Sequence, residues 1–273
     1  KLNLVLTSLK KLQHRGRESC GISWKNSDDE IKLTKTTGLV TDLEKMIDLN
    51  QQTNIAVAHV RYSTSGSKSS YDVIQPRYSK SKNFSLVHNG NVPNIDKLKL
   101  HLKLNNSNKE ISAMNDTAVL QWIIENSDDI ETGIRDILWK IPGAYSLIIM
   151  TKDGLYCVRD SHGYKPLCYS NVGDDMFLVA SESVAISKFY KYAKIIDVLP
   201  GQIIKIDKTG VTQLYKLAVN PFNTKICSFE YIYFMNYKTV SDGILVDDVR
   251  YKIGKVLADR DTNKYPKNTI VIG

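Results

Sequence analysis

The sequence predicts an α+β domain in which helices cover stacked β-sheets. Apolar segments typical of strands occur up to Val92, and two amphipathic helical segments follow Asn115. From Gly143 the pattern changes again, to short strands separated by turn residues. Strands, then helices, then strands again are typical of a layered α+β fold.

The first part of the chain alternates helical and strand-like segments. Leu2–Gln13 has apolar residues spaced for a helix with one buried face, and Gly16 is placed to end it. Further apolar runs predict strands, with one helical segment between the second and third. These elements are a strand beginning at Gly21–Trp24, a strand at Ile31–Thr34, a helix at Val40–Leu49 and a strand at Ile55–Val60.

The middle of the chain is predicted to be mostly helical. Ser63–Ser81 is expected to be a surface loop, and Ser85–Val92 a strand that ends in a polar turn, His88–Asn91. Asn115 and Asp116 are typical N-terminal caps of a helix. The remaining predictions are helices at Ile95–Leu104, Thr117–Asn126 and Ile130–Trp139, and a loop at Asn105–Asn115.

Short strands dominate from Gly143 onward. Lys152-Asp153-Gly154 is expected to form a hairpin turn, and a short helix is predicted at Ser181–Phe189. Cys157 and Cys168 fall inside strands and are expected to be inert core residues. The strands are predicted at Ala144–Met150, Leu155–Arg159, Leu167–Tyr169 and Met176–Ala180, near Ile195, and at Gln202–Ile206.

The composition indicates a cytosolic globular protein. The 273 residues are 42% hydrophobic and 24% charged, and no apolar run reaches membrane-spanning length. No secretory signal is visible in Leu2–Leu12, and the four cysteines lack CxxC spacing, which favours a reduced compartment. The net charge of +8 comes from lysines spread along the chain without interleaved aromatic residues, so we expect no nucleic-acid partner.

Asn89-Gly90 is the first candidate for chemistry. Asn-Gly tolerates positive φ, so the backbone can turn sharply and direct a side-chain amide and a backbone N–H at one point. An acyl-transfer enzyme needs such a pair of donors to stabilise an oxyanion. The alternative interpretation is an ordinary hairpin turn, the commonest use of this dipeptide.

Arg61 and Asp116 each have a functional and a structural interpretation. Arg61 follows an apolar strand, where its planar guanidinium suits a carboxylate ligand and equally suits a salt bridge at the rim. Asp116 lies at a helix start, where it is either a cap or an anionic partner for a cation. The residues alone leave both pairs of alternatives open.

A set of motifs runs in order from near the start of the chain to Gly254. They are Leu12-Gln-His-Arg-Gly-x-Glu-Ser19, His59-x-Arg-Tyr-Ser63, Gln75-Pro76, His88-Asn-Gly-Asn91, Asn115-Asp-Thr117, Gly143-Ala-Tyr-Ser-Leu147, Val158-Arg-Asp160, Ala180-Ser-Glu-Ser183, Pro200-Gly201 and Cys227-x-Phe-Glu-Tyr-Ile-Tyr-Phe234. In this order they resemble the glutamine phosphoribosylpyrophosphate amidotransferase family. The first and last motifs are the most specific to it.

The resemblance implies a fold and a division into domains. Residues 1–226 would form a glutaminase domain, a four-layer αββα sandwich with an incomplete N-terminus. Residues 227–273 would begin an α/β phosphoribosyltransferase domain, with a first helix over Asp242–Gly254 and a strand at Thr269–Gly273. Asp247-Asp248, at the start of that helix, would not be the acidic ribose-binding motif of such a domain.

The resemblance also implies a glutamine site. The α-carboxylate and the α-ammonium of glutamine would each have a partner of opposite charge, and the oxyanion would have two donors. The implied residues are Arg61 for the carboxylate, Asp116 for the ammonium, Asn89 and the Gly90 N–H for the oxyanion, and Arg15 and Gly16 beside the nucleophile.

The implied reaction is hydrolysis of glutamine to ammonia, which converts phosphoribosyl pyrophosphate to 5-phosphoribosylamine in purine synthesis. Family members use an N-terminal cysteine whose α-amine, with a pKa of about 8, can act as the general base. This chain begins with Lys1, and the amine of Cys20 is in a peptide bond. We therefore expect Cys20 to be a core residue and the chain as given to be inactive.

The resemblance implies cofactors only outside this chain. Mg²⁺ would act at the phosphoribosyl pyrophosphate site. Cys227 lies where some family members have the first of four iron–sulfur ligands, but no cysteine follows it here, so we expect no cluster in this chain. Glutamine and phosphoribosyl pyrophosphate are the expected ligands, and a homo-oligomer is the expected assembly.

Two alternatives stay open. One is a non-catalytic module with a glutaminase fold, which would bind glutamine or pair with another subunit. The other is a related amidotransferase, such as the hexosamine-forming enzyme.

Overall fold

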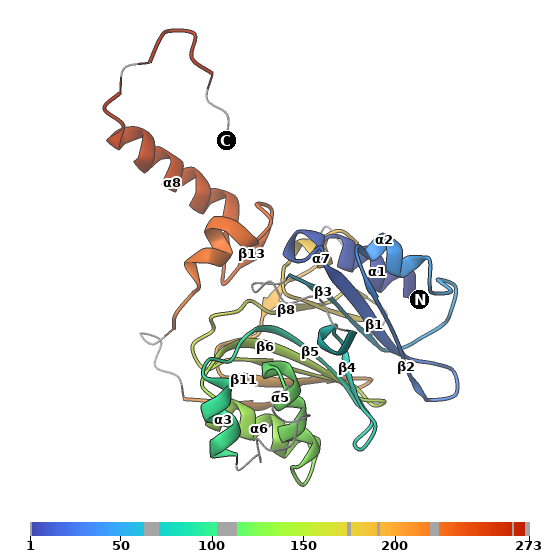
Figure 1. Cartoon of the computed structure of the whole chain (residues 1–273). Helices are drawn as coiled ribbons and strands as arrows, with labels where there is room; N and C mark the ends of the chain where they lie inside the picture. Colours follow the sequence, from blue (N-terminus) through green and yellow to red (C-terminus); the bar gives the residue numbers. More distant parts are fainter. Residues whose placement is uncertain are drawn as a thin grey trace.

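The structure, a computed structural model, describes residues 2–62, 71–102, 114–173, 176–189, 192–218, 224–263 and 265–270. Helices lie on either side of antiparallel sheets, and a helical C-terminal segment extends from this body (Figure 1). The predicted mixture of helices with several antiparallel sheets is therefore confirmed. Among the described residues, no helix is both long enough and apolar enough to cross a membrane.

The first sheet has three antiparallel strands in the order β2-β1-β3 and is covered by α1 and α2. Leu2, Leu6 and Leu9 recur every three or four residues along α1, so one face of this helix packs on the sheet. The elements are α1 (Leu2–Lys10), the 3₁₀-helix η1 (Gln13–Arg15), β1 (Ser19–Lys25), β2 (Ile31–Thr37), α2 (Val40–Glu44) and β3 (Ala56–Arg61).

The second sheet has six antiparallel strands in the order β12-β11-β7-β6-β5-β4. Its largest apolar cluster joins β5, β6 and β7 to α5 and α6, which cover the outer face of the sheet (Figure 1). The elements are η2 (Tyr71–Val73), β4 (Arg77–Ser79), β5 (Phe84–Asn91), α3 (Ile95–His101), α5 (Asp116–Glu125), α6 (Ile130–Lys140), β6 (Ala144–Met150), β7 (Leu155–Arg159), β11 (Gln202–Asp207) and β12 (Gly210–Lys216).

These two sheets pack against each other through a mainly apolar interface. The buried residues of this interface are Ile31, Val57, Val87 and Met150. One buried polar contact crosses it, because the hydroxyl oxygens of Ser23 and Ser85 lie 2.7 Å apart and form a hydrogen bond. The packing therefore fixes how β1 and β3 face β5 and β6.

A third, smaller sheet has the order β10-β8-β9 and packs with α7 against the N-terminal segment. Ser8 of α1 donates a hydrogen bond to the Ala185 carbonyl oxygen at 2.8 Å. The elements are β8 (Cys168–Asn171), β9 (Phe177–Ala180), α7 (Val184–Ser187) and β10 (Ile196–Asp197).

The C-terminal segment starts with a π-helix and ends in the long helix α8, which projects from the body (Figure 1). Arg250 of α8 donates hydrogen bonds to the carbonyl oxygens of Tyr231 and Met235, so α8 is held against the π-helix. The elements are the π-helix Glu230–Phe234, β13 (Val240–Ser241), β14 (Ile244–Leu245) and α8 (Val246–Arg260).

Several predicted boundaries are wrong. The segment predicted as the loop Ser63–Ser81 contains β4, because Arg77–Ser79 pairs with the start of β5; residues 63–70 lie outside the described part. Helix α2 ends at Glu44 rather than Leu49, and an Asp48 side chain that accepts from the Asn50 N–H forms a turn instead. Strand β12 was not predicted, since its residues are mostly polar and it lies at the sheet edge.

The predicted loop 105–115 and the C-terminal predictions are tested only in part. Residues 103–113 lie outside the described part, and of the two predicted caps only Asn115 is the N-cap, accepting from the Ala118 N–H at 2.9 Å. Helix α8 begins at Val246 rather than Asp242, after the short strand β14. Residues 269–270 are not in a strand, and 271–273 are not described.

We expect Leu120→Ala to lower the free energy of unfolding by about 2–5 kcal/mol, because Leu120 is fully buried between α5 and the second sheet. The matched variant Leu100→Ala, in α3, should change it by less than about 0.5 kcal/mol because Leu100 is 65% exposed. Urea unfolding followed by circular dichroism measures both. Equal losses would contradict the placement of α5.

Candidate functional site

Gly16 allows the N-terminal segment to lie directly against the end of β3. A Cβ atom at position 16 would be 2.3 Å from the carbonyl carbon of Arg61, far inside van der Waals contact. Only glycine can therefore follow η1 at this point.

Arg61 ends β3, and its Nη1 lies 3.4 Å from a carboxylate oxygen of Glu18. Arg61 therefore forms the salt bridge that was its structural interpretation. The distance is long, and the Glu18 side chain is partly exposed.

Asn89 and Gly90 do not form the predicted turn. Strand β5 continues through Asn91, and Asn89 and Gly90 pair with Ser146 and Tyr145 of β6. The dipeptide fits a strand end because Gly90 has φ of +152° and a Cβ there would lie 2.0 Å from the Ala144 carbonyl oxygen. Glycine is required by the close approach of β6, not by a reversal of the chain.

The side-chain amide of Asn89 is a buried donor without a partner. Among the described residues, its Nδ2 has no hydrogen-bond acceptor. Leaving a buried donor unpaired costs roughly 1–3 kcal/mol, so such a group calls for an explanation. A ligand oxygen that reaches Asn89 would supply the missing acceptor.

His88 is the point where β3, β5 and α5 meet. Its carbonyl oxygen lies 3.2 Å from His59 Nε2 and accepts from Gln75 Nε2 at 3.3 Å. Its backbone N–H donates to Gln75 Oε1 at 2.6 Å, and its ring Nδ1 lies 3.1 Å from Thr117 Oγ1. His59 is two residues before Arg61, so this contact places the end of β3 beside the strand that carries Asn89 and Gly90.

Asp116 lies beside the same stretch of β5. Its carboxylate accepts from the Val92 N–H at 3.3 Å and from the Thr117 N–H at 2.8 Å, and it lies 3.9 Å from His88 Nδ1. Asp116 is the first residue of α5 and not its cap, and the N–H of Val92, the residue after β5, holds its carboxylate toward the end of this strand. The structure therefore brings Asp116 and the Asn89-Gly90 pair together around His88, and the His59 contact connects this region to β3, which ends with Arg61.

Burial keeps the imidazoles of this region uncharged at neutral pH. Burial is the main cause that lowers the pKa of His59 to about 4, with the neighbouring His88, Arg61 and Arg15 adding to it. Burial also lowers the pKa of His88, although the Asp116 carboxylate opposes this. The charges of the region therefore come from its guanidinium and carboxylate groups and from the Lys165 ammonium, which also lowers the pKa of His88.

Arg15 is held by two carboxylates. Its Nη1 donates to Glu182 at 2.7 Å and its Nη2 to Glu230 at 3.0 Å, and its side chain is 10% exposed. These bonds use two of the five guanidinium donors. Arg15 thus lies next to Gly16 and the end of β3, with its orientation set by residues far along the chain.

Sequence reasoning did not single out Gln75, Glu182 or Glu230 as functional residues. All three fall inside quoted motifs, and all three are buried. A polar residue within an ordered motif was the available signal, but a sequence pattern does not say which polar side chain turns inward.

Three comparisons relate this chain to known proteins. A family model described as a glutamine amidotransferase domain matches residues 59–188. Curated amidophosphoribosyltransferases are 36% identical over 270 residues in Methanocaldococcus jannaschii and 35% identical over 259 residues in Bacillus subtilis. This chain is homologous to the amidophosphoribosyltransferases. The alignments cover 90% and 92% of the chain but 55% and 52% of those relatives, so the chain spans about half their length.

Two solved structures share the fold. The Bacillus subtilis glutamine phosphoribosylpyrophosphate amidotransferase, in complex with ADP and GMP, matches with a TM-score of 0.80 at 30% identity. A structure described as the allosteric regulatory enzyme of purine biosynthesis matches with a TM-score of 0.82 at 32% identity. Each covers 96% of this chain, and this chain covers 56% of each.

Three of the four cysteines are buried. Cys20 is fully buried, and burial raises the pKa of its thiol to about 11, so it is a protonated core residue as predicted. Cys157 and Cys168 are also buried, and burial raises the pKa of both thiols. Cys227 is half-buried, and the described residues contain no group of three or more His, Cys, Asp or Glu that could hold a metal ion.

The buried histidines make a pH prediction possible. The pKa of His59 is about 4 in the folded chain and 6.5 as a free side chain, so the unfolded chain binds more protons between these values. Stability should therefore fall as the pH falls from 6.5 to 4, by up to about 1.4 kcal/mol per pH unit for this group. His59→Gln should flatten that part of the curve in urea unfolding at a series of pH values. An unchanged slope in the variant would contradict a neutral His59.

Proposed function

We propose that this chain is the glutamine-hydrolysing part of an amidophosphoribosyltransferase. The parent reaction would release ammonia from glutamine and transfer it to phosphoribosyl pyrophosphate, giving 5-phosphoribosylamine in purine synthesis. The observation that carries the proposal is the meeting of Asp116 and the Asn89-Gly90 pair around His88, which His59 connects to β3, the strand that ends with Arg61. These groups are far apart in the sequence, and together they match the charges and the carbonyl of one glutamine molecule.

Each group has a role that its chemistry suits. Arg61 binds the α-carboxylate through its planar guanidinium, and its long contact with Glu18 is weak enough to be exchanged for the ligand. Asp116 binds the α-ammonium. The Asn89 amide, which has no acceptor among the described residues, and the Gly90 N–H stabilise the oxyanion.

The reaction needs a cysteine thiolate that attacks the side-chain carbonyl carbon of glutamine. The C–N bond then breaks, ammonia leaves with the proton taken from the thiol, and water hydrolyses the thioester to glutamate. The four cysteines of Lys1–Gly273 do not fit this role, since none is N-terminal and three are buried. We therefore propose that the polypeptide Lys1–Gly273 alone does not hydrolyse glutamine.

A cavity between two sheet edges suits the strand that would carry such a cysteine. Among the described residues, β3 pairs only with β1, and β9 only with β8. A cavity of about 190 Å³ separates these two edges. Its apolar lining comes from α1 (Leu4, Val5), β3 (Ala56, Val57, Ala58), β6 (Ile148), β7 (Leu155) and β9 (Phe177, Leu178, Val179, Ala180).

The lining shows what could occupy this cavity. The lining combines helix α1, two strands of the six-stranded sheet, and β3 and β9, each of which has one free edge within the described part of the chain. A single extended strand would pair with both edges and bury its alternate side chains on both faces. We propose that this strand joins the two small sheets into one and completes a four-layer αββα sandwich.

The division into domains follows the same proposal. Residues 1–226 form the glutaminase domain, and 227–273 begin the phosphoribosyltransferase domain with α8 as its first helix. Mg²⁺ binding to pyrophosphate, an iron–sulfur cluster involving Cys227 and assembly into a homo-oligomer are proposed for the parent protein only. The exposed apolar residues of α8, Leu257 among them, fit a helix that packs against further chain.

The activity test uses the protein extended upstream of Lys1 so that a cysteine is its first residue. Arg61→Ala and Asn89→Ala should each lower kcat/KM for glutamine by about a hundredfold or more, because each removes a group that binds the substrate or its oxyanion. Ammonia release measures the effect.

The matched controls are Arg135→Ala in α6 and Asn50→Ala in the loop before β3, both on the exposed surface and remote from His88. They should retain activity within about twofold. Full activity in Arg61→Ala and Asn89→Ala would remove the assigned roles. Ammonia release by Lys1–Gly273 itself would show that the missing nucleophile is not required.

The strand proposal is tested by amide hydrogen exchange. The outward-facing amides of β3 and β9 should exchange freely in Lys1–Gly273 and become protected by about tenfold or more in the upstream-extended protein, because the added strand would bond to them. Amides of β1, which is paired on both sides, are the internal control. Equal exchange of β3 and β9 in the two proteins would rule out a strand in this cavity.

A further inference from the structure

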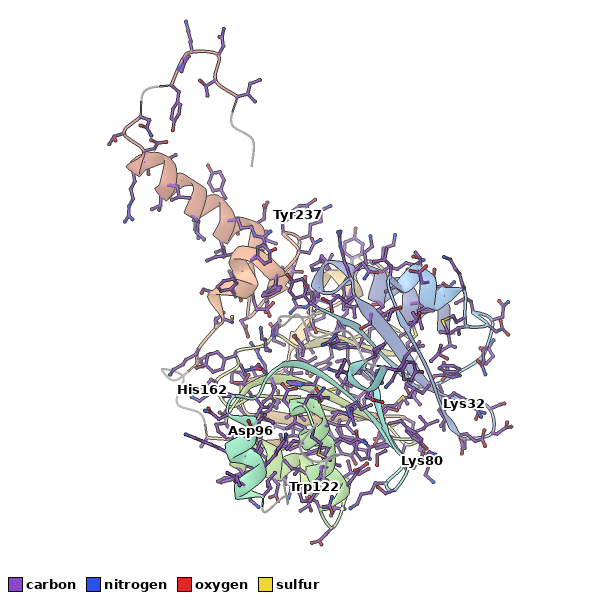
Figure 2. The ribbon with its side chains drawn as sticks, viewed as in Figure 1. Lys32, Lys80, Asp96, Trp122, His162 and Tyr237 are labelled. Carbon is purple, nitrogen blue, oxygen red and sulfur yellow. The ribbon has the colours of Figure 1, made fainter. Side chains whose placement is uncertain are left out.

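Residues 227–246 are fastened to the body by buried charged groups. Tyr237, labelled in Figure 2, belongs to this segment and lies where the C-terminal part meets the body. The contacts come from three carboxylates, those of Glu182, Glu230 and Asp242. Their partners include Arg15, the residue that precedes the close contact between Gly16 and β3.

Glu182 binds both to His14 and Arg15 and to residues 227–246, so it connects these two parts of the chain directly. One carboxylate oxygen is 2.7 Å from both Arg15 Nη1 and His14 Nε2. The other accepts from the Asn236 N–H at 2.8 Å and from the Thr239 hydroxyl at 2.7 Å. Burial opposes the charge of Glu182, but His14 and Arg15 outweigh it and lower the pKa of this carboxyl to about 2.

Glu230, which itself lies within residues 227–246, also connects this segment to Arg15. It belongs to the π-helix of the C-terminal segment, and its side chain is 1% exposed. Its carboxylate accepts from Arg15 Nη2 and from Lys165 Nζ, each at 3.0 Å. Burial alone would lower the pKa of Arg15, but the Glu230 and Glu182 carboxylates raise it, so the guanidinium keeps its charge.

A separate ion pair holds the same segment without contacting Arg15. Arg159 of β7 binds both carboxylate oxygens of Asp242, at 2.7 and 2.8 Å. Ser183 also accepts from the Val240 N–H at 2.8 Å. Residues 227–246 are therefore attached partly through Arg15 and partly through contacts that do not involve it, of which the ion pair at Asp242 is one.

We propose that Glu182 and Glu230 are positioning residues for Arg15, and that Glu230 makes the orientation of Arg15 depend on the docking of residues 227–246. The place of Arg15 in the glutamine site, beside the nucleophile, is implied by the family resemblance and rests on the proposed function. Its orientation by the two carboxylates rests on the ion pairs alone. A displaced C-terminal segment would withdraw Glu230 and leave the buried guanidinium short of one partner, which is unfavourable in a site with little water.

The first test is amide hydrogen exchange on Lys1–Gly273 with Glu230→Gln. Exchange of residues 12–18 and 228–241 should both rise by about tenfold or more, because the variant removes one charge partner of Arg15 and of Lys165. Glu131→Gln, a surface variant in α6, is the matched control and should change neither segment.

Asp242→Asn tests the dependence on docking, because Asp242 does not touch Arg15. We expect faster exchange in 228–241 and, through Glu230, in 12–18. Loosening of 228–241 with unchanged exchange in 12–18 would overturn the proposal, as would no change in either segment with Glu230→Gln. If circular dichroism shows that a charge variant does not fold, Thr239→Val takes its place. This variant removes only a neutral donor to Glu182, and it should raise the amide exchange of both segments.

A kinetic measurement separates positioning from stability. In the upstream-extended protein, Glu230→Gln should raise KM for glutamine by about tenfold and change kcat by less than about threefold, because it disturbs binding and not the reacting groups. An unchanged KM would overturn the role of Glu230 at the site. If that protein hydrolyses no glutamine at all, the proposed function fails while the exchange results still decide whether Arg15 and residues 227–246 are coupled.

Discussion

The contacts of the His88 carbonyl oxygen are the interaction on which the candidate site depends. His59 reaches it from β3 and Gln75 from the segment before β4. One buried acceptor, together with the Ser23–Ser85 hydrogen bond, thus connects two sheets that pack mainly through apolar side chains. A buried backbone carbonyl must be paired, and here its partners are side chains from outside its own sheet. This places the end of β3 where Asn89, Gly90 and Asp116 already lie.

Two close backbone approaches make this arrangement possible. Gly16 lets η1 touch the end of β3, and Gly90 lets β5 lie against Ala144 of β6. Both are positions where any Cβ would clash with backbone, which cannot move aside as a flexible side chain can. Each of the two motifs therefore needs its glycine so that two backbone segments can approach closely. These two close approaches determine the geometry of the site.

A network of charged residues also adjoins the end of β3, through Arg15 and the neighbouring Gly16. A buried ion network such as Arg15 with Glu182 and Glu230 adds little net stability, because removing each charge from water offsets much of the attraction. It does specify orientation, since breaking one pair leaves an unpaired buried charge. The network thus links the ordering of the C-terminal segment to the conformation of the N-terminal one.

The prediction from sequence was best for elements with a strong period and weakest where the backbone pairs with a distant segment. Strands β6, β7 and β11 and helices α5 and α6 were expected close to their observed bounds. The prediction of a turn at Asn89-Gly90 was wrong. The dipeptide favours a turn locally, but its pairing with β6 holds both residues in a strand. Edge strands β4 and β12 were missed for the same reason, since an edge strand owes its conformation to one neighbour.

By itself, the sequence determined the layered α+β class, the homology and which residues could bind a zwitterion, because apolar periodicity and residue chemistry are local properties. Only the tertiary structure decided that Asp116 faces β5, that Arg15 is held by Glu182 and Glu230, and that two strand edges flank a cavity. These facts depend on distances between segments up to 215 positions apart in the chain, and such distances are set by packing.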